Sequence, residues 1–163
     1  MKKYSKSDQK LLAIWAADCA ERVLPFFEKM YPEDNRPRKA IDVLRYWIRT
    51  GVFKMTEIRG ASLAAHAAAR NVKDNSVACF AARAAGQAVA TAHVSQHAYG
   101  SSYYSLKAII AANPVNSEVK VIQEYSWQSR HLHKRLRQEI MSRIIISHNK
   151  MGVVIKIKKG DGF

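Results

Sequence analysis

Apolar residues recur at steps of three and four along most of this chain, which is the spacing of one face of an α-helix. In the first stretch, for example, Leu12, Trp15, Cys19 and Val23 fall on such a face. The pattern predicts six helices, at about residues 7–31, 37–50, 57–71, 76–98 and 102–112, and from about 117 onward. We therefore expect an all-α protein, built as a compact bundle of about six helices.

Residues that favour helix ends stand between several of these segments. Gly51 is placed to end the second helix in a left-handed conformation. The polar residues 74–76 are placed to cap the fourth helix. We expect Gly100 to stop the fourth helix, and Ser101 or Ser102 to cap the fifth.

Alanine dominates the middle of the chain, where it accounts for 15 of the 38 residues from Ala61 to Ala98. Alanine is the best helix former, and its small side chain lets two helix backbones approach closely. We call this stretch the alanine seam and expect it to form the centre of the bundle. A large side chain at Ala82 or Ala85 should therefore overpack a close contact between helices.

The C-terminal end follows a different pattern. The apolar stripe of the long sixth helix runs from Ile122 to Ile144, and β-branched residues are frequent after it. The partly alternating stretch 151–159 is typical of a strand. One strand has nothing to pair with, so we expect a basic tail that is extended or lies as an edge on the helices. The predicted division is a helical domain at 1–148 and a basic C-terminal tail at 149–163.

The chain is strongly basic, with 27 Lys and Arg against 13 Asp and Glu and a net charge of +14. Such a charge attracts polyanions, which include nucleic acid, acidic proteins and anionic surfaces. No run of about 18 apolar residues is present, and the N-terminal segment does not resemble a signal peptide. We therefore expect a cytoplasmic protein with no membrane partner. The sequence leaves the oligomeric state open.

The residue types that carry chemistry are sparse. Cys19 and Cys79 each stand alone in alanine-rich helical stretches, which predicts buried thiols rather than a disulfide or a zinc site. His93 and His97 are four residues apart and are expected to share a helix face, but no third metal ligand accompanies them. We predict no metal, no cofactor and no catalytic residues, because no phosphate loop, nucleophile elbow or carboxylate pair is present.

Two groups of polar residues are candidates for binding. The first group lies in otherwise apolar helical stretches and predicts a polar pocket: Asp18, Arg22, His66, Arg70, Arg83, His93 and His97. Ordinary ion pairs between helices, with Asp18 expected to face Arg22 one turn away, explain the same residues. The second group is basic, belongs to an arginine-rich loop and the sixth helix, and predicts a partner-binding surface: Arg36, Arg38, Lys39, Arg130, Lys134 and Arg137.

Several blocks of the sequence, in the same order, resemble a bacterial family of putative immunity proteins, the immunity-five-like domain of polymorphic toxin systems. The longest blocks are residues 15–25 (WAADCAERVLP), 36–41 (RPRKAI), 64–70 (AAHAAAR) and 81–94 (AARAAGQAVATAHV). Shorter matches lie at residues 97–98, 104, 107–108 and 127–128. The resemblance covers about residues 8–137 and leaves out the tail.

The resemblance implies a protein that binds a cognate bacterial toxin and neutralises it by steric occlusion, without being an enzyme. The positive charge then predicts a toxin with an acidic surface. Two alternatives stay open. One is nucleic-acid binding through the basic sixth helix and the tail. The other is an enzyme whose polar residues converge on one pocket: Arg22, His66, Arg70, Arg83, His93 and His97.

Overall fold

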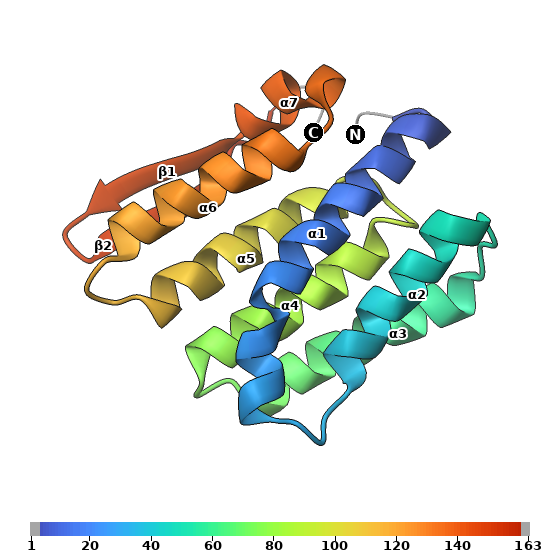
Figure 1. Ribbon diagram of the computed structural model, residues 1–163, viewed down its shortest axis with the longest axis horizontal. Helices are drawn as coiled ribbons and strands as arrows, with labels where there is room; N and C mark the ends of the chain where they lie inside the picture. Colours follow the sequence, from blue (N-terminus) through green and yellow to red (C-terminus); the bar gives the residue numbers. More distant parts are fainter. Residues whose placement is uncertain (1–3, 161–163) are drawn as a thin grey trace.

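The computed structural model describes residues 4–160, and this part of the chain forms seven helices followed by two strands (Figure 1). The helices are α1 (Lys6–Met30), α2 (Arg36–Thr50), α3 (Met55–Asn71), α4 (Ser76–Ala90), α5 (His97–Ala112), α6 (Ser117–His131) and α7 (Lys134–Met141). The strands are β1 (Ile144–Asn149) and β2 (Gly152–Ile157). The predicted helical bundle is confirmed, with a small two-stranded sheet added to it.

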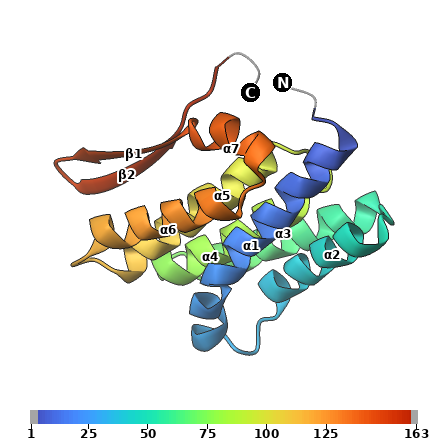
Figure 2. The ribbon, with the colours of Figure 1, turned by 45° about the horizontal axis from the view of Figure 1, so that its top comes forward.

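The alanine seam forms the centre of the bundle, as predicted. Helix α4 packs against α1, α2, α3 and α5, and Ala82, Ala85 and Ala88 on it are completely buried. Ala65 and Ala68 of α3 are equally buried. Larger side chains fill the space around these close contacts, chiefly on α1 and α2: Leu12, Trp15, Leu24, Phe27, Ile41 and Leu44. On the other side α6 packs against α5, and β2 also contacts α5 (Figures 1 and 2).

Two predicted helix ends are confirmed by their backbone geometry. Gly51 ends α2 with a φ of 71°, in the left-handed region, and its N–H donates to the carbonyl of Trp47. Asn75 caps α4, because its side-chain oxygen accepts a hydrogen bond of 3.1 Å from the N–H of Ala78.

The predicted boundary between the fourth and fifth helices was wrong. Helix α4 ends at Ala90, and α5 begins at His97, so Gly100, Ser101 and Ser102 all lie inside α5. The serines are buried and bond across the bundle instead of capping a helix. Ser101 Oγ donates to the carbonyl of Ala16 at 2.7 Å, and Ser102 Oγ donates to Oε1 of Gln128 at 2.5 Å.

The predicted long sixth helix is also interrupted. The backbone is extended at Leu132, and His133 caps the separate helix α7 by accepting a hydrogen bond from the N–H of Arg135. Ile122, which the apolar stripe placed in the core, has 50% of its surface exposed. Leu132 and Ile140 are buried as expected. The apolar stripe therefore predicted buried positions correctly in the second half of this region.

The C-terminal region pairs with itself, which corrects the prediction of a lone strand. Strands β1 and β2 form an antiparallel hairpin in which Ile144 lies opposite Ile157 and Asn149 lies opposite Gly152. Gly152 has a φ of 111°, which a residue with a side chain rarely adopts. The predicted division at residue 149 falls at the end of β1. Ile155 of β2 is buried, so the hairpin adds to the core.

Both cysteines are free and buried, as predicted. Burial raises the pKa of the Cys19 thiol well above its usual value, and the nearby carboxylates of Glu124 and Asp18 raise it further. The thiol is therefore protonated and acts as a small apolar side chain. Among residues 4–160, no helix is both long enough and apolar enough to cross a membrane.

Candidate functional site

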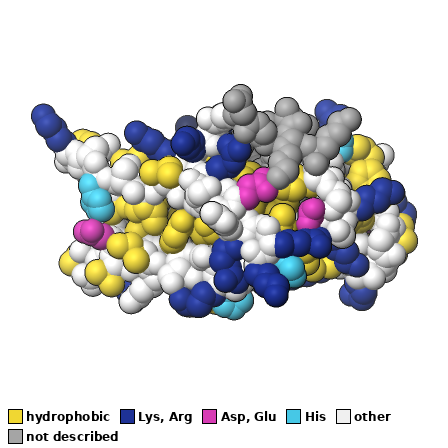
Figure 3. All heavy atoms as spheres, turned by 90° about the horizontal axis from the view of Figure 1, so that it is seen from above, with side chains coloured by type: hydrophobic (Ala, Val, Ile, Leu, Met, Phe, Trp, Pro, Cys, Tyr) yellow, Lys and Arg dark blue, Asp and Glu magenta, His cyan; other side chains and the backbone are white. Residues whose placement is uncertain are grey.

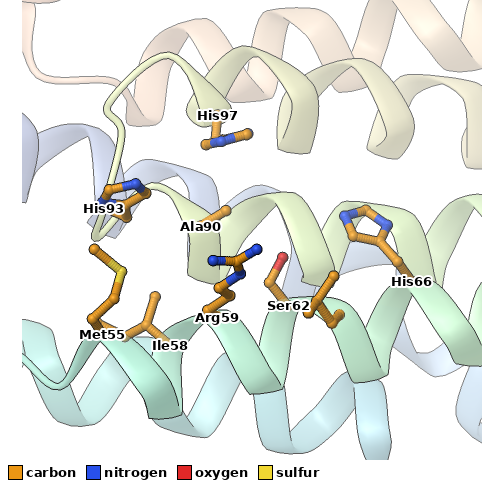
Figure 4. Close-up of a pocket in the computed structure, with 9 residues that line it drawn as sticks. Met55, Ile58, Arg59, Ser62, His66, Ala90, His93 and His97 are labelled. Atoms are coloured by element: carbon orange, nitrogen blue, oxygen red, sulfur yellow. The ribbon is translucent and has the colours of Figure 1, made fainter.

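A cavity of about 380 Å³ opens between α3, the end of α4 and the start of α5 (Figure 4). We call it the histidine pocket. Its polar lining consists of Arg59, Ser62, His66, His93 and His97. Its apolar lining consists of Met55, Ile58, Leu63 and Ala90. The pocket thus unites three of the seven residues that the sequence singled out for a polar site.

Three separate pieces of backbone supply the polar side chains. Arg59, Ser62 and His66 follow one another at steps of three and four on α3, so they share one helix face. His93 lies in the turn after α4, and His97 is the first residue of α5. The expectation that these two histidines share a helix face was wrong; they meet at the pocket because the turn reverses the chain.

Gln87 on α4 links two of the imidazoles. His97 Nδ1 lies 2.8 Å from Gln87 Oε1, so this ring nitrogen carries a hydrogen and donates it. Gln87 Nε2 lies 3.5 Å from His66 Nε2, which accepts in turn. The neutral His66 ring therefore carries its hydrogen on Nδ1, and that atom is buried without a hydrogen-bond partner among the described residues.

Two glycines make room for this linked set. A Cβ atom at Gly86 would lie 2.9 Å from His66 Nε2, closer than real Cβ contacts. A Cβ atom at Gly100 would collide with the side chain of Gln87. The absence of a side chain at these two positions lets His66 pack against α4 and lets Gln87 pack against α5. Gly86 and Gln87 are adjacent in the sequence, inside the longest block of family resemblance.

The electrostatics of the pocket favour neutral rings at His66 and His97, beside the permanent positive charge of Arg59. Burial is the main cause that lowers the pKa of His66, and the charges of Arg83 and Arg70 lower it further. Burial and the neighbouring His93 lower the pKa of His97. None of the residues that line the pocket is acidic. Arg59 therefore supplies a positive charge that no lining carboxylate offsets.

The other members of the predicted polar pocket lie in different surroundings. Asp18 pairs with Arg45 at 2.6 Å rather than with Arg22, so that expectation was wrong. Arg22 reaches across to α6, where its Nε lies 2.9 Å from Glu124 Oε2. Arg83 lies over the ring of Tyr104, 5.8 Å from its centre. Arg70 is exposed at the end of α3. The set proposed for an enzyme is thus divided, because Arg22 belongs to the α1–α6 contact.

The predicted basic surface also divides into two parts. Arg36 opens α2 and pairs with Asp34 at 2.6 Å, and Arg38 pairs with Glu28 at 2.8 Å. Their charges are therefore offset within the chain. Lys39 beside them is exposed.

The second part, on α6 and α7, bonds to neutral partners. Arg130 donates to the hydroxyl of Ser126 at 2.6 Å, and Arg137 donates to the carbonyls of Arg130 and Leu132. Lys134 is exposed. Lys and Arg side chains gather on the face of the molecule in Figure 3. We call the surface formed by Arg130, Lys134 and Arg137 the α6–α7 face.

An aromatic residue lies next to the α6–α7 face. The guanidinium carbon of Arg22 lies 4.0 Å from the centre of the Trp127 ring. The imidazole of His131 stacks on the same residue, with ring centres 3.9 Å apart. Trp127, in contact with both of these planar groups, is partly exposed beside a basic surface.

Sequence reasoning missed Arg59, Ser62 and Gln87. Arg59 and Ser62 fall outside the resembling blocks, and only their spacing from His66 on one helix could have indicated them. Gln87 lies in the longest block of the family resemblance, where nothing in the local sequence indicates that it belongs to a polar site. Within residues 4–160, no group of three or more His, Cys, Asp or Glu side chains is arranged to hold a metal ion.

Comparison with known proteins identifies the family. No curated protein and no solved structure matches the chain. The family model described as "Imm-5 like putative immunity protein" matches residues 2–135. This segment includes helices α1 to α6, with the whole histidine pocket, and excludes the β-hairpin. Because the match spans most of the sequence, the chain belongs to the Imm-5 like putative immunity protein family.

Proposed function

We propose that the protein binds a cognate bacterial toxin and neutralises it by steric occlusion. The family match over residues 2–135 is the observation that carries this proposal, since it supports an immunity role. Steric occlusion requires only a rigid surface that covers the functional site of the toxin. A standard interface buries about 800 Å² on each partner, which is roughly a tenth of the 8798 Å² surface of this protein.

The α6–α7 face is the part of the predicted surface that we propose for the first encounter. Arg130 and Arg137 bond to hydroxyl and carbonyl oxygens, so these partners do not offset their positive charges. A toxin with an acidic surface would be attracted to it over several ångströms, which speeds association. Trp127 and Arg22 beside the face belong to the residue types that most often dominate binding energy at interfaces.

The proposal is tested with the purified product of the neighbouring gene as the candidate toxin. We expect a stable complex in a pull-down and in calorimetry, and survival of cells that express both proteins. The double variant Arg130→Glu/Lys134→Glu should slow association at low salt by about tenfold, because two attractive charges become repulsive. The control Arg49→Glu/Lys73→Glu makes the same change in net charge at exposed positions elsewhere, and should slow association much less. Absence of both a complex and protection would overturn the proposal.

The same charged face favours nucleic-acid binding as a second candidate function. Lysine and arginine contacts to phosphates release counterions, so the affinity of such a complex falls steeply with salt. A gel shift with duplex DNA and with single-stranded RNA at low salt tests it. Binding that disappears in the Arg130→Glu/Lys134→Glu variant would support this candidate, and no shift at low salt would exclude it.

A further inference from the structure

The histidine pocket has the size and lining of a binding site for a small group. Its volume of about 380 Å³ is at the lower end of the range for ligand pockets, roughly 300–1,000 Å³. Met55 and Leu63 at its edge have 41% and 56% of their surfaces exposed. Apolar side chains of this size gain free energy when a partner removes them from water.

Two of the polar lining residues have already donated their hydrogens within the protein, His97 Nδ1 to Gln87 and the Ser62 hydroxyl to the carbonyl of Gly86. Figure 4 shows Arg59, His93 and His97 approaching Ala90 from different sides. Arg59 carries five N–H donors on a planar, permanently charged group. Arg59 is therefore the lining residue that offers charged donors to an acceptor on a ligand.

We propose that the histidine pocket binds a carboxylate carried on an apolar group, with Arg59 pairing with the carboxylate and Met55, Ile58 and Leu63 covering the apolar part. A single permanent charge in the lining matches a single negative charge on the ligand. The two oxygens of a carboxylate match the forked donors of an arginine side chain. The absence of any acidic lining residue removes the repulsion that an anion would otherwise meet.

Such a carboxylate has two sources that use the same contacts. One is a small organic acid, and the other is an acidic side chain of a bound protein. The second source rests on the proposed function, because the protein would then be the toxin. Binding of a small organic acid does not depend on the proposed function.

The pocket is tested by nuclear magnetic resonance titration of the full chain with sodium hexanoate. Hexan-1-ol and hexylammonium, at the same ionic strength, serve as probes that keep the apolar part and change the charged end. We expect hexanoate to shift amide signals of α3 and of the start of α5 in a saturable way. Hexanol should bind about tenfold more weakly, because it lacks the charge-assisted hydrogen bonds, and hexylammonium more weakly still.

Two variants locate the binding. Arg59→Gln should weaken hexanoate binding about tenfold and leave hexanol binding unchanged, whereas Arg49→Gln removes the same charge from an exposed position on α2 and should change neither. Ala90→Leu should fill the cavity and weaken both probes. The proposal is overturned if hexanoate gives no saturable shifts, if hexanol binds equally well, or if Arg59→Gln has no effect.

A final arm separates the two sources. The product of the neighbouring gene, as the candidate toxin, is added to the protein saturated with hexanoate. If the toxin displaces hexanoate, and Ala90→Leu weakens toxin binding, the carboxylate belongs to the toxin. If both bind together, the pocket takes a small acid. If the toxin does not bind at all, the proposed function fails while the titration result stands, so the two failures are distinguishable.

Discussion

Glu124 is a buried carboxylate in the core, and its partners explain why it is tolerated. Only 3% of its side chain is exposed. Nε of Arg22 donates to both of its oxygens, at 3.1 and 2.9 Å, and Gln128 Nε2 donates to Oε1 at 3.3 Å. Ser102 in turn donates to Gln128. A buried charge is tolerated only when such partners replace its hydrogen bonds to water. Removing one partner leaves the charge partly unsatisfied and therefore lowers the stability of the fold.

We predict that Arg22→Met lowers the free energy of unfolding by about 1–3 kcal/mol, the cost of leaving a buried charged group unsatisfied. The value should fall toward the lower end, because 40% of the Arg22 side chain is exposed and water can partly replace it. Urea unfolding measures the change. The double variant Arg22→Met/Glu124→Leu should recover most of the loss, because it removes both charges. A double variant as unstable as the sum of the two single variants would contradict this account.

His97 gives a prediction for the dependence of stability on pH. Burial and His93 lower the pKa of His97 in the folded state, whereas in the unfolded chain it stays near 6.5. The unfolded chain then binds more protons, so the contribution of His97 to stability is complete above a pH of about 6.5 and is lost as pH falls through the folded pKa. His66 acts in the same direction.

We therefore predict that the protein loses stability between about pH 7.5 and pH 5.5, and that His97→Asn loses less over the same interval. The asparagine amide introduced by this substitution can keep the hydrogen bond to Gln87 but does not titrate in this range. Urea unfolding at the two pH values checks the difference. An equal loss in the wild-type protein and in the variant would show that His97 does not contribute.

At the scale of elements, the alanine seam determines how closely the helices approach. Ala82 is completely buried on α4, where leucine would force neighbouring side chains or backbones apart. We predict that Ala82→Leu lowers the free energy of unfolding by about 1–3 kcal/mol, measured by urea unfolding. Gln123→Leu introduces the same residue at an exposed position of α6 and should change stability by less than about 0.5 kcal/mol. If leucine at both Ala82 and Ala85 causes no loss of stability, the close contact between helices does not lie at these residues.

The helices were largely predictable from the sequence, and their exceptions have physical causes. The turn between α4 and α5 contains alanine and valine but no proline or glycine, so the helical pattern runs through it. Gly100, which looks like a helix end, is instead the place where Gln87 packs. The hairpin was missed because Ile144 also continues the apolar stripe of α6. Pairing with β2 depends on contacts between distant residues, which a local pattern does not contain.

The candidate site was less predictable than the fold. The three histidines could be singled out because they interrupt an apolar pattern. Their neighbours Arg59 and Ser62 look like ordinary polar residues of an amphipathic face. Gln87 gains its role only because the turn after α4 brings His97 back toward it. Which residues of different helices lie close together depends on how the helices pack. The periodicity along one helix does not determine that packing.

At the scale of the whole molecule, ion pairs within residues 4–160 engage many of the acidic residues and leave most of the basic residues there without an acidic partner. Arg45 engages both Asp18 and Glu21, and Arg135 engages Asp8. Further carboxylates pair with Arg22, Arg36 and Arg38. These pairs join six carboxylates to five arginines, whereas the whole chain has 13 acidic residues and 27 Lys and Arg. The excess basic groups therefore face solvent and any approaching partner.

This distribution predicts how the proposed binding to a toxin depends on salt. Attraction between separated charges is screened beyond about 10 Å at 0.1 M ionic strength and beyond about 3 Å at 1 M. The association rate constant should therefore fall at least tenfold between low and high salt, while the dissociation rate constant changes little because contacts in the complex are short. Stopped-flow fluorescence with the product of the neighbouring gene, as the candidate toxin, measures the association rate constant. Competition with unlabelled protein measures the dissociation rate constant.

The Arg130→Glu/Lys134→Glu variant makes this prediction specific to the α6–α7 face. If that face guides the encounter, the association rate of the variant should be lower at low salt and should depend less on salt than that of the wild-type protein. At high salt the two rates should converge, because screening removes the contribution that the substitutions abolish. An association rate of the wild-type protein that is constant or rises with salt would show that the toxin's contact surface is not acidic, and occlusion would then have to begin at an uncharged part of the bundle.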